Sequence, residues 1–184
     1  MRTVHRRSAL VAGALVLVAA AAGGASASAS EGHGGGGKDE ARLVGAAKLF
    51  REDGQRVRFS FDARGFGWNE LPDGKGTSRG TFRFSHYTPD GKDGAFAEGR
   101  IDCLETGGPV ATATGVITRT DLKGAKGKRV GFTVYDNGRH DRVGYSWGGG
   151  DGDLRTMEVE PCLSAAPYET VEKGDFTVHH KMPF

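Results

Sequence analysis

The chain has 184 residues, of which 37% are hydrophobic, with 25 Lys and Arg residues against 23 Asp and Glu residues. Arg2, Arg6 and Arg7 lie in an N-terminal segment that we expect to be cleaved, which leaves 22 basic and 23 acidic residues and a formal charge of −1. A charge this close to zero removes the main support for a basic nucleic-acid-binding or membrane-surface protein. We therefore expect no nucleic-acid partner.

Residues 1–29 have the three parts of a secretory signal peptide. A basic start (MRTVHRR) precedes an apolar run (ALVAGALVLVAAAAGG) and two overlapping small-x-small sites, with cleavage after Ala27 or Ala29. The run is too short for a retained transmembrane helix, and no later segment is long enough to span a bilayer. The sequence therefore predicts a secreted protein with no membrane span.

Residues 30–40 (SEGHGGGGKDE) contain no apolar side chain and predict a flexible Gly-rich spacer. Residues 41–184 are enough for one domain with its own core. Their dominant signal is alternation of apolar and polar residues, interrupted by turn signals such as LPDGKG and TPDGKDG. The candidate strands are residues 43–50, 56–61, 81–86, 96–104, 110–118, 129–136, 142–147, 155–159 and 175–180.

Short strands at this spacing, without a helical apolar stripe, predict an all-β domain. The architecture is a single antiparallel sandwich or a closed barrel of about eight or nine short strands, and the pattern leaves both open. Glycines inside the strands indicate bends or bulges, which favour strong curvature. They are Gly45, Gly99, Gly115, Gly131 and Gly144.

The chain has two cysteines, Cys103 and Cys162. An even pair in an exported protein predicts one disulfide. Closing the intervening loop contributes about 4 kcal/mol in the chain-entropy model. Neither cysteine has a Cys or His at zinc-ligand spacing, and we expect no metal and no cofactor.

The dipeptide Asn137-Gly138 favours a two-residue type I′ hairpin turn. That turn would pair Phe132 with Val143 and set Asp141 on the core side of the sheet. A bulge or a longer loop is the alternative, and it would turn this carboxylate outward.

Three residues are candidates for catalysis: His86, Asp141 and His180. The two histidines fall on the apolar-facing register of their strands, and a histidine beside a carboxylate can transfer protons or bind a metal. The interpretation we favour is that each residue lies just past the last buried residue of its strand, where the strand emerges into solvent. No G-x-S-x-G nucleophile motif is present. We therefore predict no catalytic site unless these strand ends meet.

The blocks GTFRFSHY, AFAEGRIDCL, GKRVGFTVYDNGRHDRVGYSW and CLSAAPYETVEKGDFTVHH carry a family resemblance. With them the chain resembles small secreted proteins of actinobacteria that are sometimes labelled repetin-like. The resemblance covers nearly all of residues 41–184. It implies a secreted β-rich domain and transfers no catalytic residue.

The sequence thus favours an exported, non-catalytic binding or structural module, as a component of the cell envelope or of the extracellular medium. Two alternatives stay open. One is a small secreted enzyme with a His/Asp site at one end of the sheet. The other is a barrel that holds a small apolar ligand. A filled core would favour the binding or structural module. An apolar cavity would favour the ligand carrier, and a polar pocket that joins the strand ends would favour the enzyme.

Overall fold

The computed structural model describes residues 40–70, 72–73, 75–146 and 159–182. The predicted signal peptide, residues 30–39 of the spacer and residues 155–158 of the strand predicted at 155–159 lie outside the described residues. All regular elements of the described part are β-strands. No helix of that part has the length and hydropathy needed to cross a membrane.

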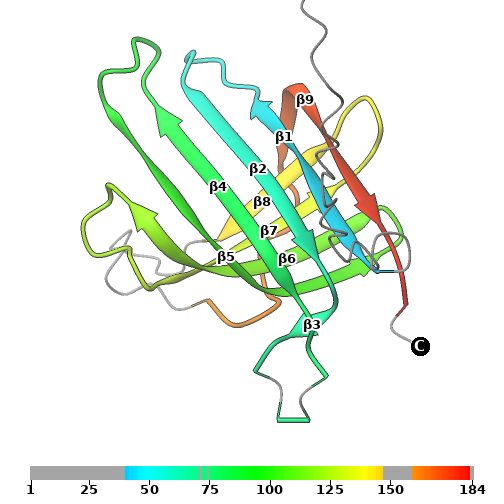
Figure 1. The fold of residues 1–184 in the computed structure, drawn as a ribbon. Coiled ribbons are helices and arrows are strands. Elements are labelled where there is room, and N and C mark those ends of the chain that lie inside the picture. Colours follow the sequence, from blue (N-terminus) through cyan, green and yellow to red (C-terminus); the bar gives the residue numbers. More distant parts are fainter. Residues whose placement is uncertain (1–39, 71, 74, 147–158, 183–184) are drawn as a thin grey trace, which may run out of the picture. The chain divides into compact units, whose positions relative to one another are not determined.

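Eight strands close into an antiparallel barrel in the order β1-β2-β4-β5-β6-β7-β8-β9, with β9 paired back to β1 (Figure 1). The short β3 pairs only with β5. The prediction of an all-β fold is confirmed, and the barrel is the correct alternative. The strands are β1 (Arg42–Leu49), β2 (Arg56–Arg64), β3 (Gly67–Trp68), β4 (Arg79–Tyr87), β5 (Gly94–Gly107), β6 (Val110–Thr120), β7 (Arg129–Tyr135), β8 (Arg142–Ser146) and β9 (Glu169–His179).

Alternation locates every strand of the barrel but misplaces some ends. The largest difference is β9, which begins at Glu169, because a register shift opposite Lys48 and Leu49 interrupts its alternation. Alternation does not predict β3, since two residues are too few to show a period. A register shift between Glu98 and Gly99 in β5 confirms a bulge beside one of the strand glycines.

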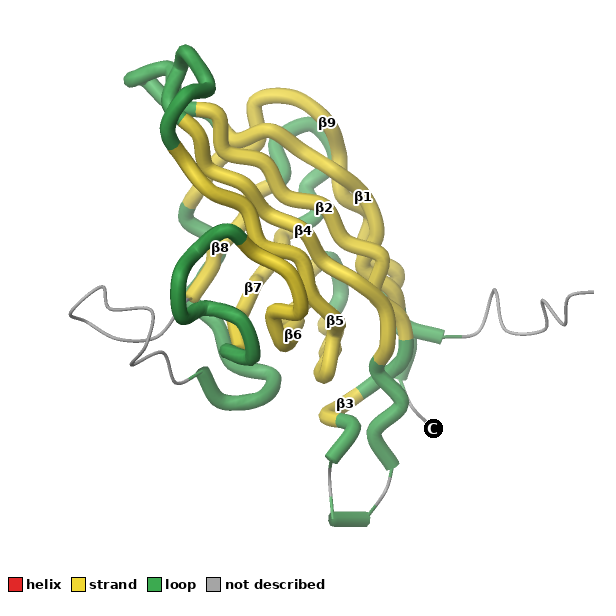
Figure 2. Tube along the Cα trace, turned by 60° about the vertical axis from the view of Figure 1, so that its left-hand side comes forward, coloured by secondary structure: helices red, strands yellow, loops and turns green. Residues whose placement is uncertain are grey.

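Aromatic rings from opposite walls fill the middle of the barrel. The ring of Phe132 in β7 lies 5.1 Å from that of Phe61 in β2 and 5.0 Å from that of Phe82 in β4, centroid to centroid. In the closed ring β7 stands opposite β2, so these contacts cross the interior (Figure 2). The barrel is a packed core, and it gives no support to the hypothesis of an apolar-ligand carrier.

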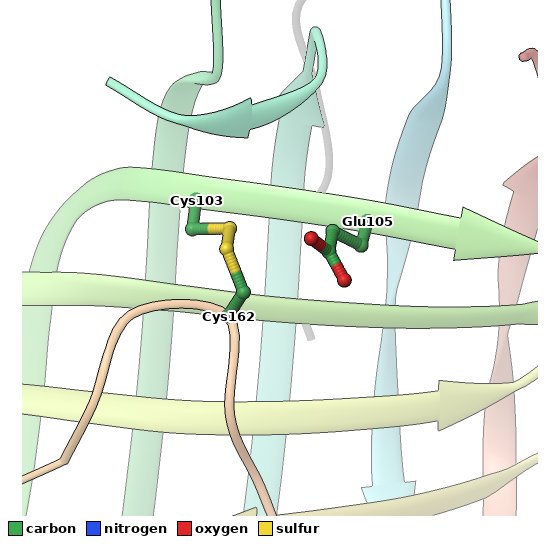
Figure 3. A group of neighbouring side chains, drawn as sticks. All are labelled: Cys103, Glu105 and Cys162. Atoms are coloured by element: carbon green, nitrogen blue, oxygen red, sulfur yellow. A yellow bond between two sulfur atoms is a disulfide. The ribbon is translucent and has the colours of Figure 1, made fainter. Parts of the chain in front are cut away.

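A segment we call the strap (residues 159–168) is bonded to the outer face of the barrel. Its Cys162 forms a disulfide with Cys103 of β5, with Cα atoms 5.3 Å apart, which confirms the predicted pairing (Figure 3). The backbone N–H of Cys162 donates to Oγ1 of Thr114 in β6 (3.2 Å), and a second strap N–H donates to a serine of β8 (2.8 Å). The strap is thereby fixed over β5–β8.

Two of the strand glycines allow the strap to lie this close. A Cβ atom at Gly131 would overlap the carbonyl oxygen of Leu163, and one at Gly144 would overlap the carbonyl oxygens of Ala165 and Ala166. At these two positions the glycine serves a close approach of two backbone segments.

The β7–β8 hairpin has a longer loop than the predicted two-residue turn. Phe132 pairs with Tyr145 rather than with Val143. A type I′ turn needs positive φ at both central residues, and among the two only Gly138 has it (71°), not Asn137. The type I′ prediction is therefore wrong, and the longer loop is the correct alternative.

Candidate functional site

The three candidate catalytic residues lie in separate environments. His86 is at the end of β4, where its Nε2 donates a hydrogen bond to Oε1 of Gln55. Asp141 and His180 belong to the other end of the barrel, where β8 begins and β9 ends. There Nδ1 of His180 is hydrogen-bonded to Oγ1 of Thr106 (3.0 Å). Within the described part of the chain, no hydrogen bond or ion pair joins any two of these three residues.

Asp141 is 2% exposed, and its carboxylate is occupied by backbone groups. Oδ1 accepts from the N–H of Asn137 (2.9 Å), and Oδ2 accepts from the N–H of Phe176 in β9 (2.8 Å). Asp136 likewise accepts from the N–H of Val178 (3.0 Å). Backbone pairing of β8 with β9 covers two residue pairs, so these side chains replace ladder hydrogen bonds along the rest of that seam. The prediction that Asp141 lies on the core side of the sheet is therefore correct. The β7–β8 loop is longer than two residues, but it does not turn this carboxylate outward.

The ligand atoms of Cys103, Glu105 and Cys162 lie within 4.8 Å of one another (Figure 3). A metal would bind the thiolate form of cysteine. Here the two sulfurs are bonded to each other, so in the oxidised protein this group offers one carboxylate and no thiolate.

One barrel end is crossed by a half-buried polar network. The guanidinium of Arg51 forms an ion pair with Glu169 and a hydrogen bond with the hydroxyl of Tyr145 (3.2 Å). Burial, and then the hydrogen bond with Tyr145, raise the pKa of the neighbouring Tyr168. All four groups have partners within the network, and we interpret it as closure of the barrel end.

The outward positions of three adjacent strands, β1, β2 and β4, form what we call the basic face, which runs along the near wall of the barrel in Figure 1. Alternation turns apolar residues of these strands inward and the others outward. The outward charged residues are seven cations, Arg42, Lys48, Arg56, Arg58, Arg64, Arg79 and Arg83, and one anion, Asp62. A chain of near-zero net charge thus has a strongly cationic surface over three strands.

Two hollows lie on or beside the basic face. The first hollow has a volume of about 480 Å³, and its lining includes Ala46, Lys48, Arg58, Ser60, Ser85 and Lys173. The second hollow has a volume of about 470 Å³, and its lining includes Ser60, Asp62, Thr81, Arg83, Glu98 and Arg100. Both volumes fall within the range of small-molecule sites. Small side chains form the floor of each hollow, and longer basic side chains surround that floor.

Cations in the first hollow stand in a row across the strands. Lys48 pairs directly with Arg58 of β2 on one side and with Lys173 of β9 on the other. Lys48 is neutralised by Glu172, with Nζ and Oε2 2.7 Å apart. Arg58 and Lys173 have no side-chain hydrogen bond or ion pair with any residue that the structure describes. The row therefore keeps two uncompensated positive charges.

Arg83, which borders both hollows, is paired with Glu98. Arg119 binds the same carboxylate, with Nη2 and Oε2 2.6 Å apart. The hydrogen bond from Arg119, more than the charge of Arg119, holds the pKa of Glu98 below its ordinary value. Glu98 is therefore an anion between two arginines at the edge of the second hollow.

Sequence reasoning did not identify the basic face, although its signal is present. In RVRFSFDAR and RGTFRF the polar positions of the alternation are mostly arginine. The net charge of the chain does not show this arginine pattern, because acidic residues cancel the total charge. Most of those acidic residues lie in loops and not on the basic face.

No family model, no curated protein and no solved structure matches this chain. The resemblance to secreted actinobacterial proteins stays a prediction.

Proposed function

We propose that the protein is an exported, non-catalytic binding module whose basic face binds an anionic ligand. The observation behind this proposal is the row of Lys173, Lys48 and Arg58 at the first hollow. Like charges directly opposite each other on neighbouring strands destabilise a sheet. In this row Glu172 offsets the charge of the middle cation, Lys48. A bound anion would offset the two outer cations, Arg58 and Lys173, so the row favours the liganded state.

The packed interior supports a ligand on the outside of the barrel. Rings from opposite walls are in contact, and the two hollows described above open on the outer surface. The enzyme alternative has less support, because His86 and Asp141 have other hydrogen-bond partners and lie at opposite ends of the barrel.

Binding of dextran sulfate, with neutral dextran as the reference polymer, tests the proposal. The double substitution Arg58→Gln and Lys173→Gln should weaken dextran sulfate binding about threefold to tenfold, since each exposed ionic contact contributes a few tenths to about 1 kcal/mol. Higher ionic strength should weaken binding further by screening. Isothermal titration of the oxidised protein measures both effects.

The matched control is the double substitution Lys123→Gln and Arg139→Gln. It removes the same charge from exposed side chains of the β6–β7 and β7–β8 loops. It should leave binding unchanged. Equal weakening by both variants would reduce the effect to net charge and overturn the proposal, as would equal affinity for the two polymers.

A further inference from the structure

We propose that the anionic ligand is an acidic polysaccharide whose chain lies across the barrel, from the first hollow to the second. This inference rests on the proposed function and adds the class of ligand and its direction. Three features of the surface support it: the hollows are continuous, the charge changes between them, and hydroxyl side chains border them.

The two hollows form one path. Ser60 and Arg83 line both of them, and these residues are direct neighbours across β2 and β4. The first hollow extends from there to Lys173 of β9, and the second extends to Arg100 of β5. A ligand that touches both ends must span five adjacent strands, which are spaced about 4.8 Å apart. A single small anion cannot do so, whereas an extended chain can.

Charge changes along this path. The charged side chains lining the first hollow, Lys48, Arg58, Arg83 and Lys173, are all cations. In the second hollow, two carboxylates and two guanidiniums are mixed. A polymer with a phosphate at every link would meet the carboxylates of the second hollow unfavourably. A glycan with spaced acidic groups can place an acid in the first hollow and donate hydroxyl hydrogens to carboxylates in the second.

The floor of the path suits sugars better than nucleic-acid bases. Hydroxyl groups of Ser60 and Thr81 border it, and they can donate to and accept from sugar hydroxyls. Proteins that bind single-stranded nucleic acid stack bases on aromatic rings. The phenylalanines at the edge of the hollows, Phe59, Phe61 and Phe82, are only 2–4% exposed and point into the core. The nearby ring of Phe96 already contacts the guanidiniums of two arginines.

Hyaluronan oligosaccharides of increasing length, in which only every second sugar carries a carboxylate, test this inference by isothermal titration, with glucuronate as the monomer. As the chain lengthens, the affinity per molecule should rise by a larger factor than the number of acidic groups does. The reason is that a chain long enough to reach the second hollow gains a further contact within the same complex. Arg58→Gln should weaken all lengths roughly threefold. Arg100→Gln should weaken only chains long enough to reach the second hollow. Both side chains are exposed and form no hydrogen bond or ion pair with any residue of the described part, so melting curves should not change.

Affinity that rises only in proportion to the number of acids, or equal effects of Arg58→Gln and Arg100→Gln at every length, would overturn the polymer inference. If dextran sulfate still bound through Arg58 and Lys173, the proposed function would survive that failure. Tighter binding of a thymidine oligonucleotide than of a hyaluronan oligosaccharide with the same number of charges would overturn the choice of a polysaccharide. Binding of none of these anions would overturn both proposals.

Discussion

The outer face over β6, β7 and β8 is covered by the strap, whereas the outer face over β1, β2 and β4 is open. Outward residues of the covered wall are small and buried: Thr114 is 0% exposed and Thr133 is 6% exposed. On the open wall the outward residues include the exposed arginines Arg58 and Arg83. Both walls have the same alternating strands and share one core. Their outer faces therefore differ because one is a second packing surface and the other meets solvent.

This difference indicates that one wall stabilises the fold and the other is available for binding. The strapped wall adds buried contacts and a covalent bond outside the barrel, which stabilise the fold. The open wall keeps like charges beside one another, which a structure selected only for stability would avoid. The seam between β8 and β9, where carboxylates replace backbone pairing, joins the two walls.

Breaking the disulfide should have the largest effect. Cys103→Ser should lower the free energy of unfolding by roughly 2–5 kcal/mol, because the loop closed by the bond regains its freedom in the unfolded chain. Chemical denaturation measures the loss. Hydrogen exchange should increase in β6–β8 more than in β1, β2 and β4. Reductant should destabilise the native protein but not the variant, and two freely alkylatable thiols in the native protein would contradict the pairing.

Crowding the strap should have a smaller effect. Gly144→Ala places a methyl group against the backbone carbonyls of Ala165 and Ala166 and should cost about 1–3 kcal/mol. In the Cys103→Ser background the cost should shrink, since a released strap can move away, and a double-mutant cycle measures that coupling. Gly107→Ala is the control, because a Cβ atom there meets nothing within 4 Å. Additive effects of the two substitutions would contradict the close approach.

The smallest expected effect is a pH dependence at the seam. Burial, and then the charge of Asp141, raise the pKa of Asp175 above its ordinary value in the folded protein. The folded state thus holds this proton more tightly than the unfolded state. Its contribution to stability is complete below the ordinary Asp pKa and is lost as pH rises through the raised value.

Asp175→Asn should therefore be more stable than the native protein at neutral pH, and the two should converge in acid. Melting temperatures measured against pH test this. A variant less stable than the native protein at neutral pH would show that the Asp175 carboxylate is favourable there.

Much of the fold could be predicted from local patterns. Val57, Phe59 and Phe61 mark an inward face because alternate side chains of a strand point to opposite sides. The disulfide was predicted from the pair of cysteines together with the predicted signal peptide. The candidate site could not be predicted in this way, because Lys173 and Lys48 are far apart in the sequence and become neighbours only when β9 pairs with β1.

The role of Asp141 could not be predicted from the sequence either. Its sequence position indicates a carboxylate on the core side of a hairpin, which is usually a sign of a partner or a function. Its partner, the N–H of Phe176, lies 35 residues away in the chain. Only closure of the barrel decides that this carboxylate completes a seam rather than meeting a histidine.

The sequence by itself predicted the eight strands of the barrel, though not all of their ends, the side chains that point inward from them, and the two sulfurs that are bonded. Those properties depend on neighbours along the chain or on a count. Tertiary structure alone decided that the sheet closes into a filled barrel, that the strap covers one wall, and that cations of β9, β1 and β2 form one row. These features depend on the order in which distant strands pair, and the side-chain pattern within one strand does not encode that order.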